Sequence, residues 1–107
     1  MEKLAKRAAT EALNSPLPYQ LGSLVIKGGK TLAIGYNNGK KHAEVHALTQ
    51  LTVKQAKGGD LIVVRVNKKG LAMSKPCKKC QATIILYGIK RVYYTDSDGN
   101  IQKLMLR

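Results

Sequence analysis

The 107-residue sequence predicts one α/β domain, a three-layer α/β/α sandwich around a five-stranded mixed sheet. Helical and strand-like patterns alternate along the chain in the order α-β-β-α-β-α-β-β. Residues 61–66 are aliphatic apart from Arg65, which is typical of a central strand covered on both faces. The connection between the last two strands, residues 96–100, is too short for a crossover, so these strands are expected to run antiparallel.

The first half of the chain is expected to hold two helices and a hairpin. Residues 2–13 have apolar side chains at helical spacing, and Pro16 and Pro18 follow their end. Residues 21–27 and 30–36 are apolar, β-branched runs, and the glycine pair at 28–29 predicts a two-residue hairpin turn between them. A helix over 42–57 follows, ended by a second glycine pair. Its expected inward-facing side chains are Val45, Leu48, Thr49 and Thr52.

The second half is expected to add one helix and the remaining strands. Residues 67–75 follow the aliphatic strand and are interpreted as a loop. The next helix spans 77–87 and ends at Gly88. Strands are expected over 90–95 and 101–106, joined by a polar turn. No linker or repeat divides the chain, so residues 1–107 are expected to form a single domain.

The sequence is strongly basic, with 19 Lys and Arg against 6 Asp and Glu and a formal net charge of +13. Such an excess favours polyanions as partners, although a solvated lysine-rich surface would give the same composition. Several lysines lie within a few residues of His42, Cys77 and Cys80 in the sequence. They are Lys40, Lys41, Lys75, Lys78 and Lys79.

The N-terminal residues do not resemble a targeting segment. Charges interrupt residues 1–14, and no later apolar run approaches the length of a membrane span. The expectation is a soluble, cytoplasmic protein without a membrane partner.

One histidine and two cysteines form a candidate metal site. His42, Cys77 and Cys80 supply the three protein ligands that a catalytic zinc uses when it keeps a fourth position open. Glu44 follows the histidine by two residues and is a candidate proton carrier. Two alternatives remain at this point: a redox-active Cys-x-x-Cys motif, and a structural zinc site completed by His46.

The pattern His-x-Glu followed by Pro-Cys-x-x-Cys resembles the cytidine and deoxycytidylate deaminase superfamily. This superfamily includes the AID/APOBEC polynucleotide deaminases and the tRNA adenosine deaminases. The resemblance extends in order through residues 35–37, 42–44, 75–80 and 88–94. It implies a cytidine deaminase-like fold.

The resemblance also implies roles for individual residues. Zinc (Zn2+) would be held by His42, Cys77 and Cys80, and Glu44 would carry protons during hydrolytic deamination of a nucleobase. By the same resemblance, the Ala43 backbone N–H and Asn37 are expected to contact substrate. Base stacking adds Tyr93, although alternation along a strand allows at most one of Tyr93 and Tyr94 to do so. Charge placement adds four lysines: Lys41, Lys75, Lys78 and Lys79. For Asn37, the alternative is a turn residue with no contact to substrate. For His46, the expected role is packing.

The substrate expected from the sequence is cytosine in single-stranded nucleic acid, DNA or RNA, because cations surround the candidate ligands and a duplex hides its bases. The antiparallel final strands instead resemble deaminases of free nucleosides. Free cytidine, deoxycytidine or their monophosphates are therefore the alternative substrates. A third possibility is a non-catalytic, zinc-stapled nucleic-acid-binding module. An oligomer is compatible with each possibility.

Overall fold

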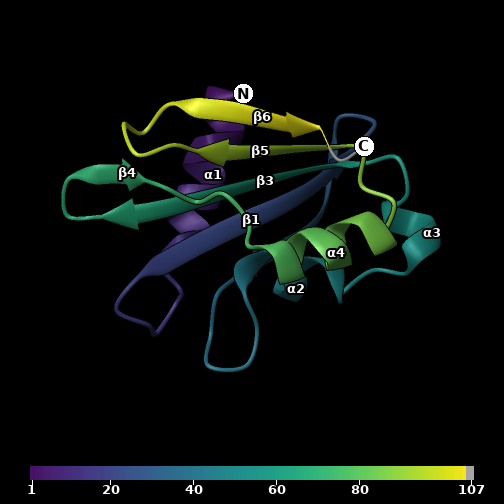
Figure 1. The fold of residues 1–107 in the computed structure, drawn as a ribbon, viewed down its shortest axis with the longest axis horizontal. Coiled ribbons are helices and arrows are strands. Elements are labelled where there is room, and N and C mark those ends of the chain that lie inside the picture. Colours follow the sequence, from purple (N-terminus) through teal and green to yellow (C-terminus); the bar gives the residue numbers. More distant parts are fainter. Residues whose placement is uncertain (106–107) are drawn as a thin grey trace.

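The structure, a computed structural model, describes residues 1–105. Its mixed sheet has the strand order β2-β1-β3-β5-β6, with a short strand β4 paired to β3 (Figure 1). The strands are β1 (Gln20–Lys27), β2 (Lys30–Tyr36), β3 (Asp60–Asn67), β4 (Gly70–Ala72), β5 (Arg91–Thr95) and β6 (Ile101–Met105). Only the β3–β5 pair is parallel among the described strand pairs.

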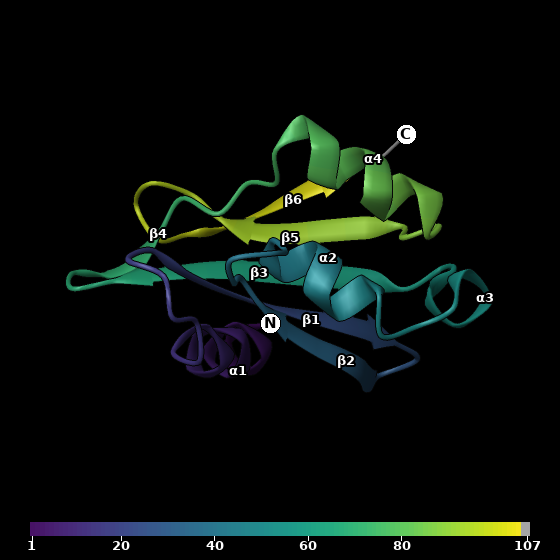
Figure 2. The same ribbon diagram turned by 90° about the horizontal axis from the view of Figure 1, so that it is seen from below.

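Helices cover both faces of this sheet, as the sequence predicts. Figure 2 shows α1 (Glu2–Ala12) on one side and α2 (Ala43–Leu48) with α4 (Lys78–Leu86) on the other. A short helix, α3 (Val53–Ala56), lies at one end of the sheet. The three-layer α/β/α architecture is therefore confirmed.

Strand β3 shows why the sandwich has two cores. Leu61 and Val63 face the side of α2 and α4, whereas Ile62 and Val64 face α1, because side chains alternate along a strand. All four are buried. This confirms the prediction of a central strand covered on both faces.

Both predicted chain reversals are present. Gly28 and Gly29 have φ values of 59° and 76°, a left-handed backbone that a two-residue hairpin turn requires and glycine adopts easily. Strands β5 and β6 pair antiparallel, with Thr95 opposite Ile101. The last residue predicted for that strand, Leu106, lies outside the described residues.

Two predicted elements differ from the structure. The helix expected over 42–57 is broken into α2 and α3, because Thr52 forms a capping box with Gln55 and starts a new helix. Thr49 and Thr52, predicted to face inward, are exposed as a result. The loop expected over 67–75 contains β4, which makes the sheet six-stranded rather than five-stranded. Three residues are too few to show an alternating pattern.

No helix within residues 1–105 combines the length and the apolar character needed to cross a membrane.

Candidate active site

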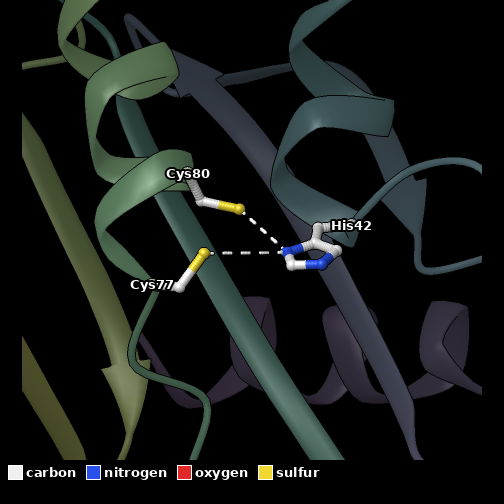
Figure 3. Close-up of side chains that lie close together, drawn as sticks. All are labelled: His42, Cys77 and Cys80. Atoms are coloured by element: carbon white, nitrogen blue, oxygen red, sulfur yellow. Dashed lines mark hydrogen bonds between the residues drawn. The ribbon is translucent and has the colours of Figure 1, made fainter.

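The site forms where two helices begin side by side. His42 is the N-cap residue of α2, and Cys77 is the N-cap residue of α4. Figure 3 shows the two cysteines on α4 and its preceding loop, pointing toward the His42 ring. Segments 35 or more residues apart in sequence therefore supply one cluster.

The cluster has the dimensions of a zinc site. The His42 Nδ1 atom lies 3.0 Å from Cys80 Sγ and 3.9 Å from Cys77 Sγ. Tetrahedral zinc with ordinary bond lengths places sulfur and nitrogen ligands roughly 3.6 Å apart, within the observed range. All three ligand atoms lie within 4.8 Å of one another, and no other group of three such residues forms in the described chain. The donor set therefore fits zinc.

A cavity of about 180 Å³ opens beside this cluster. Its lining includes His42 and Cys77 from the cluster and Glu44 from α2. The remaining lining residues are Tyr19, Leu21, Asn37, Ala43, Arg65, Met73, Ser74, Lys75 and Pro76. A ligand in this cavity would contact the metal centre, a carboxyl group and two basic side chains.

Glu44 is buried, with 3% of its surface exposed. Loss of solvent raises the pKa of its carboxyl group, while its own backbone N–H and the charge of His42 act in the opposite direction. A carboxyl group with a raised pKa holds and releases a proton nearer neutral pH than an exposed one.

The two cysteines differ in their surroundings. Cys80 is buried and Cys77 is exposed. In the metal-free protein, burial raises the pKa of the Cys80 thiol, and the charges of Glu44 and Cys77 add to this effect. A bound cation reverses that balance, because zinc favours the thiolate form of its ligands.

Buried hydroxyl groups hold both ligand segments on the sheet. Ser23 Oγ in β1 donates a hydrogen bond to the Ala43 carbonyl, 2.8 Å away. Ser74 Oγ donates to the Val63 carbonyl at 2.8 Å and accepts from the Thr95 backbone N–H at 2.7 Å. The chain just before Cys77 is thus anchored to β3 and β5.

Asn37 lies at the cavity wall and also has a structural role. Its Oδ1 accepts from the Leu21 N–H at 2.8 Å, and its Nδ2 donates to the Tyr19 carbonyl at 2.9 Å. One amide hydrogen and one oxygen lone pair remain for a ligand. The structure therefore brings Asn37 to the site, where its side chain also ties the end of β2 to residues 19–21. Asn37 does not adopt the left-handed backbone of a turn residue, because all positive φ values in residues 1–105 are at glycines.

The predicted lysine contacts fall into three places. Lys75 lines the cavity itself. Lys41 and Lys79 line a second hollow of about 210 Å³ on another side of His42, together with Lys40. Lys78 is exposed at the first position of α4.

Tyr93 is not brought to the cavity. It packs near Ile62 on the α1 face, because strand alternation turns it away from the face that carries the metal cluster. Tyr94 occupies the other face and packs into the core there. Neither tyrosine is among the residues that line the cavity.

His46 packs as expected and is not part of the metal cluster. Its Nδ1 accepts a hydrogen bond from the Tyr36 N–H at 3.1 Å, and the two rings meet edge to face. The structural Cys2His2 alternative loses its fourth ligand.

Sequence reasoning missed three polar residues of the site. Tyr19 and Arg65 line the cavity, with the Arg65 guanidinium 5.9 Å from the Tyr19 ring centroid, and Ser74 anchors the cysteine loop. The one available signal was a charged residue, Arg65, inside an otherwise aliphatic strand.

Comparison with known families identifies the fold and its metal. The model of the cytidine and deoxycytidylate deaminase zinc-binding region matches residues 1–96. The chain belongs to this family. Zinc is accordingly the cofactor of this deaminase domain, with His42, Cys77 and Cys80 positioned to hold it. No curated protein matches the sequence significantly.

Solved structures of deaminases share the fold. Cytidine deaminase from Burkholderia pseudomallei superposes with a TM-score of 0.77 at 19% identity, covering 98% of this chain and 91% of that one. The dCMP deaminase of cyanophage S-TIM5 gives 0.67 at 24% identity, covering 90% and 82%. A Thermotoga maritima diaminohydroxyphosphoribosylaminopyrimidine deaminase/reductase gives 0.68 at 29% identity, covering 90% of this chain and 29% of that one.

Proposed function

We propose that this protein catalyses the hydrolytic deamination of cytosine to uracil in a free pyrimidine nucleotide. The observation that carries the proposal is the buried Glu44 carboxyl group in the same cavity as His42 and Cys77. The balanced reaction consumes one water and releases one ammonia. The family assignment supports a deaminase, and the cavity supports the roles given below.

Zinc, when held by His42, Cys77 and Cys80, would supply a Lewis acid that activates water beside the cavity. Glu44 would accept a proton from the attacking water on a carboxylate oxygen and deliver it to the ring nitrogen of the base. The second proton of the same water would pass through this carboxyl group to the exocyclic amine, which leaves as ammonia while the water oxygen stays on the ring carbon. The burial of Glu44 suits both transfers, because it keeps bulk water away from the proton that the carboxyl group carries.

Two neighbouring groups orient the base. Ala43 is the first residue of α2, so its backbone N–H has no intrahelical partner and is free to donate to the base carbonyl. Asn37 offers one remaining donor and one acceptor to the base or sugar.

The choice of a free nucleotide rests on the charge of the cavity. Arg65 and Lys75 line it and provide cations for one phosphate. The cyanophage relative is named a dCMP deaminase, and its complex contains dCMP and dUMP.

A second candidate substrate is cytosine in single-stranded nucleic acid. Lys40, Lys41 and Lys79 gather around a hollow that shares His42 with the cavity, on a chain of net charge +13. A strand entering the cavity at this side would place its backbone phosphates among these lysines.

The deciding experiment offers the zinc-loaded protein dCMP, deoxycytidine, cytidine and single-stranded DNA or RNA containing one cytosine. Uracil formation from dCMP with equimolar ammonia supports the proposal. Turnover of the oligonucleotide without turnover of dCMP would replace it with the second candidate, and no turnover of any substrate would refute both.

Salt dependence tests the second candidate directly. Binding to a single strand is expected to weaken with a log–log slope of about −0.7 for each phosphate contacted. If the lysine hollow guides a strand, the double substitution Lys41→Ala and Lys79→Ala flattens the slope. The pair Lys3→Ala and Lys6→Ala, exposed on α1, removes equal charge elsewhere and serves as the control.

A further inference from the structure

Arg65 lines the active-site cavity, and one nitrogen of its guanidinium group has no hydrogen-bond partner. Its Nε is the one buried side-chain nitrogen or oxygen without a hydrogen-bond partner in the described chain. Residues 1–105 contain one salt bridge, between Arg91 and Asp60, so Arg65 has no carboxylate partner there. A buried guanidinium N–H is costly to leave unpaired, and its natural partner is an oxyanion.

The pairing of β1 with β3 places Arg65 two residues along β3 from Val63, which is level with the start of α2. Ser23, which holds Ala43 at the start of α2, is paired with Val63. Arg65 lies two residues farther along β3, on the same face and opposite Leu21. Two residues of an extended strand span about 7 Å, comparable to the distance between a pyrimidine base and its 5′-phosphate.

The contacts that Arg65 does make leave room for a ligand. Its guanidinium carbon lies 5.9 Å from the Tyr19 ring centroid, a cation–π contact that uses none of the guanidinium N–H donors. Lys75 lines the same cavity from the chain before the cysteines. Arg65 and Lys75 therefore line one cavity, where both can contact the same anion.

We propose that Arg65, held by Tyr19 and assisted by Lys75, binds the phosphate on the 5′ side of the target cytosine. This inference rests on the proposed function and names the residue that makes the site prefer a nucleotide to a nucleoside. Arg65 is suited to this because its planar guanidinium forms paired hydrogen bonds to phosphate oxygens. The phosphate belongs to a free monophosphate or to a strand, and the experiment separates these two sources.

The kinetic test compares dCMP with deoxycytidine for wild type, Arg65→Gln and Arg65→Lys. Arg65→Gln is expected to raise KM for dCMP about 30-fold or more, with kcat changed less than about threefold and kcat/KM for deoxycytidine unchanged within about threefold. Arg65→Lys is expected to give a KM for dCMP between those of wild type and Arg65→Gln, since lysine keeps the positive charge but cannot form paired hydrogen bonds to phosphate. Arg7→Gln, exposed on α1, is the matched control and leaves all constants unchanged. An oligonucleotide with one internal cytosine identifies a strand as the phosphate source.

A binding measurement keeps the inference independent of turnover. Calorimetric titration of zinc-loaded Glu44→Gln with dCMP and deoxycytidine is expected to show tighter binding of dCMP, and adding Arg65→Gln abolishes that difference. If wild type deaminates no substrate while this difference holds, the proposed function fails and the phosphate site stands.

Equal effects of Arg65→Gln on dCMP and deoxycytidine, or none on either, overturn the inference and leave the deaminase assignment intact. Zinc content and thermal denaturation verify that each variant is folded. If Arg65→Gln does not retain zinc, Arg65→Lys carries the same comparison, and an unchanged preference for dCMP in that variant counts against the inference.

Discussion

His42 Nδ1 lies 3.0 Å from Cys80 Sγ, although 38 residues separate the two side chains in sequence. The contact joins the start of α2 to the first turn of α4 on one face of the sheet. Because zinc would bond to both atoms, the metal is expected to tie these two helix starts together.

Zinc is expected to stabilise the protein through this link. At 100 times its Kd, zinc raises the free energy of unfolding by about 2.7 kcal/mol. At roughly 4–8 °C per kcal/mol, the Tm rises by more than about 10 °C. Thermal denaturation with and without a chelator measures the shift. Cys77→Ala and Cys80→Ala are expected to lose it, whereas His46→Ala retains it; loss in the His46 variant contradicts the assigned ligand set.

Glu44→Gln is expected to bind one zinc per chain but to lose deamination activity about 100-fold or more, because the amide does not carry protons. Turnover of dCMP, with zinc analysis of the same samples, measures this separation. Activity within tenfold of wild type would exclude Glu44 as the proton carrier.

The stability of the metal-free protein is expected to depend on the ionisation of Glu44. Burial raises its folded-state pKa above the ordinary value of 4.5, so the folded chain holds this proton more tightly than the unfolded chain. The associated stability is present below pH 4.5 and is lost as pH rises through the raised pKa. Glu44→Gln therefore raises the Tm at pH 7, and the gain shrinks toward pH 4. Denaturation across this range with a chelator present measures it, and a constant gain would contradict the burial effect.

Ser74→Ala is expected to destabilise the protein by about 1–3 kcal/mol, because it leaves the buried Thr95 N–H without an acceptor. Zinc affinity is expected to fall as well, since the chain before Cys77 loses its anchor to β3. Denaturant unfolding and zinc titration measure the two effects. Ser97→Ala, at an exposed turn position, is the control and changes neither.

Gly35→Ala is expected to displace α2. A Cβ atom at this position would lie 2.5 Å from the Ala47 backbone nitrogen and 2.6 Å from the Ala43 carbonyl oxygen. Such overpacking costs about 1–3 kcal/mol and moves the helix that follows His42. Gly39→Ala meets open space and is the control. Equal stability and zinc affinity of the two variants would show that the close approach of β2 and α2 is unimportant.

Local patterns in the sequence determined most of the elements and the histidine and cysteines of the metal cluster. The double glycine at 28–29 specified a hairpin, the aliphatic run of β3 specified a central strand, and the paired motifs around His42 and Cys77 specified the cluster. The break before α3 was also encoded locally, since Thr52 and Gln55 form a capping box, but the longer helical pattern concealed it.

Tertiary structure alone decided what surrounds the metal cluster. Tyr19 and Arg65 meet because β1 pairs with β3 in one register, and a one-residue slip would turn each side chain to the opposite face. The same alternation directs Tyr93 to the α1 face, away from the cavity. Helix and turn signals act over a few neighbouring residues, whereas the walls of a cavity depend on strand pairing between segments some 40 residues apart, where short-range patterns carry no information.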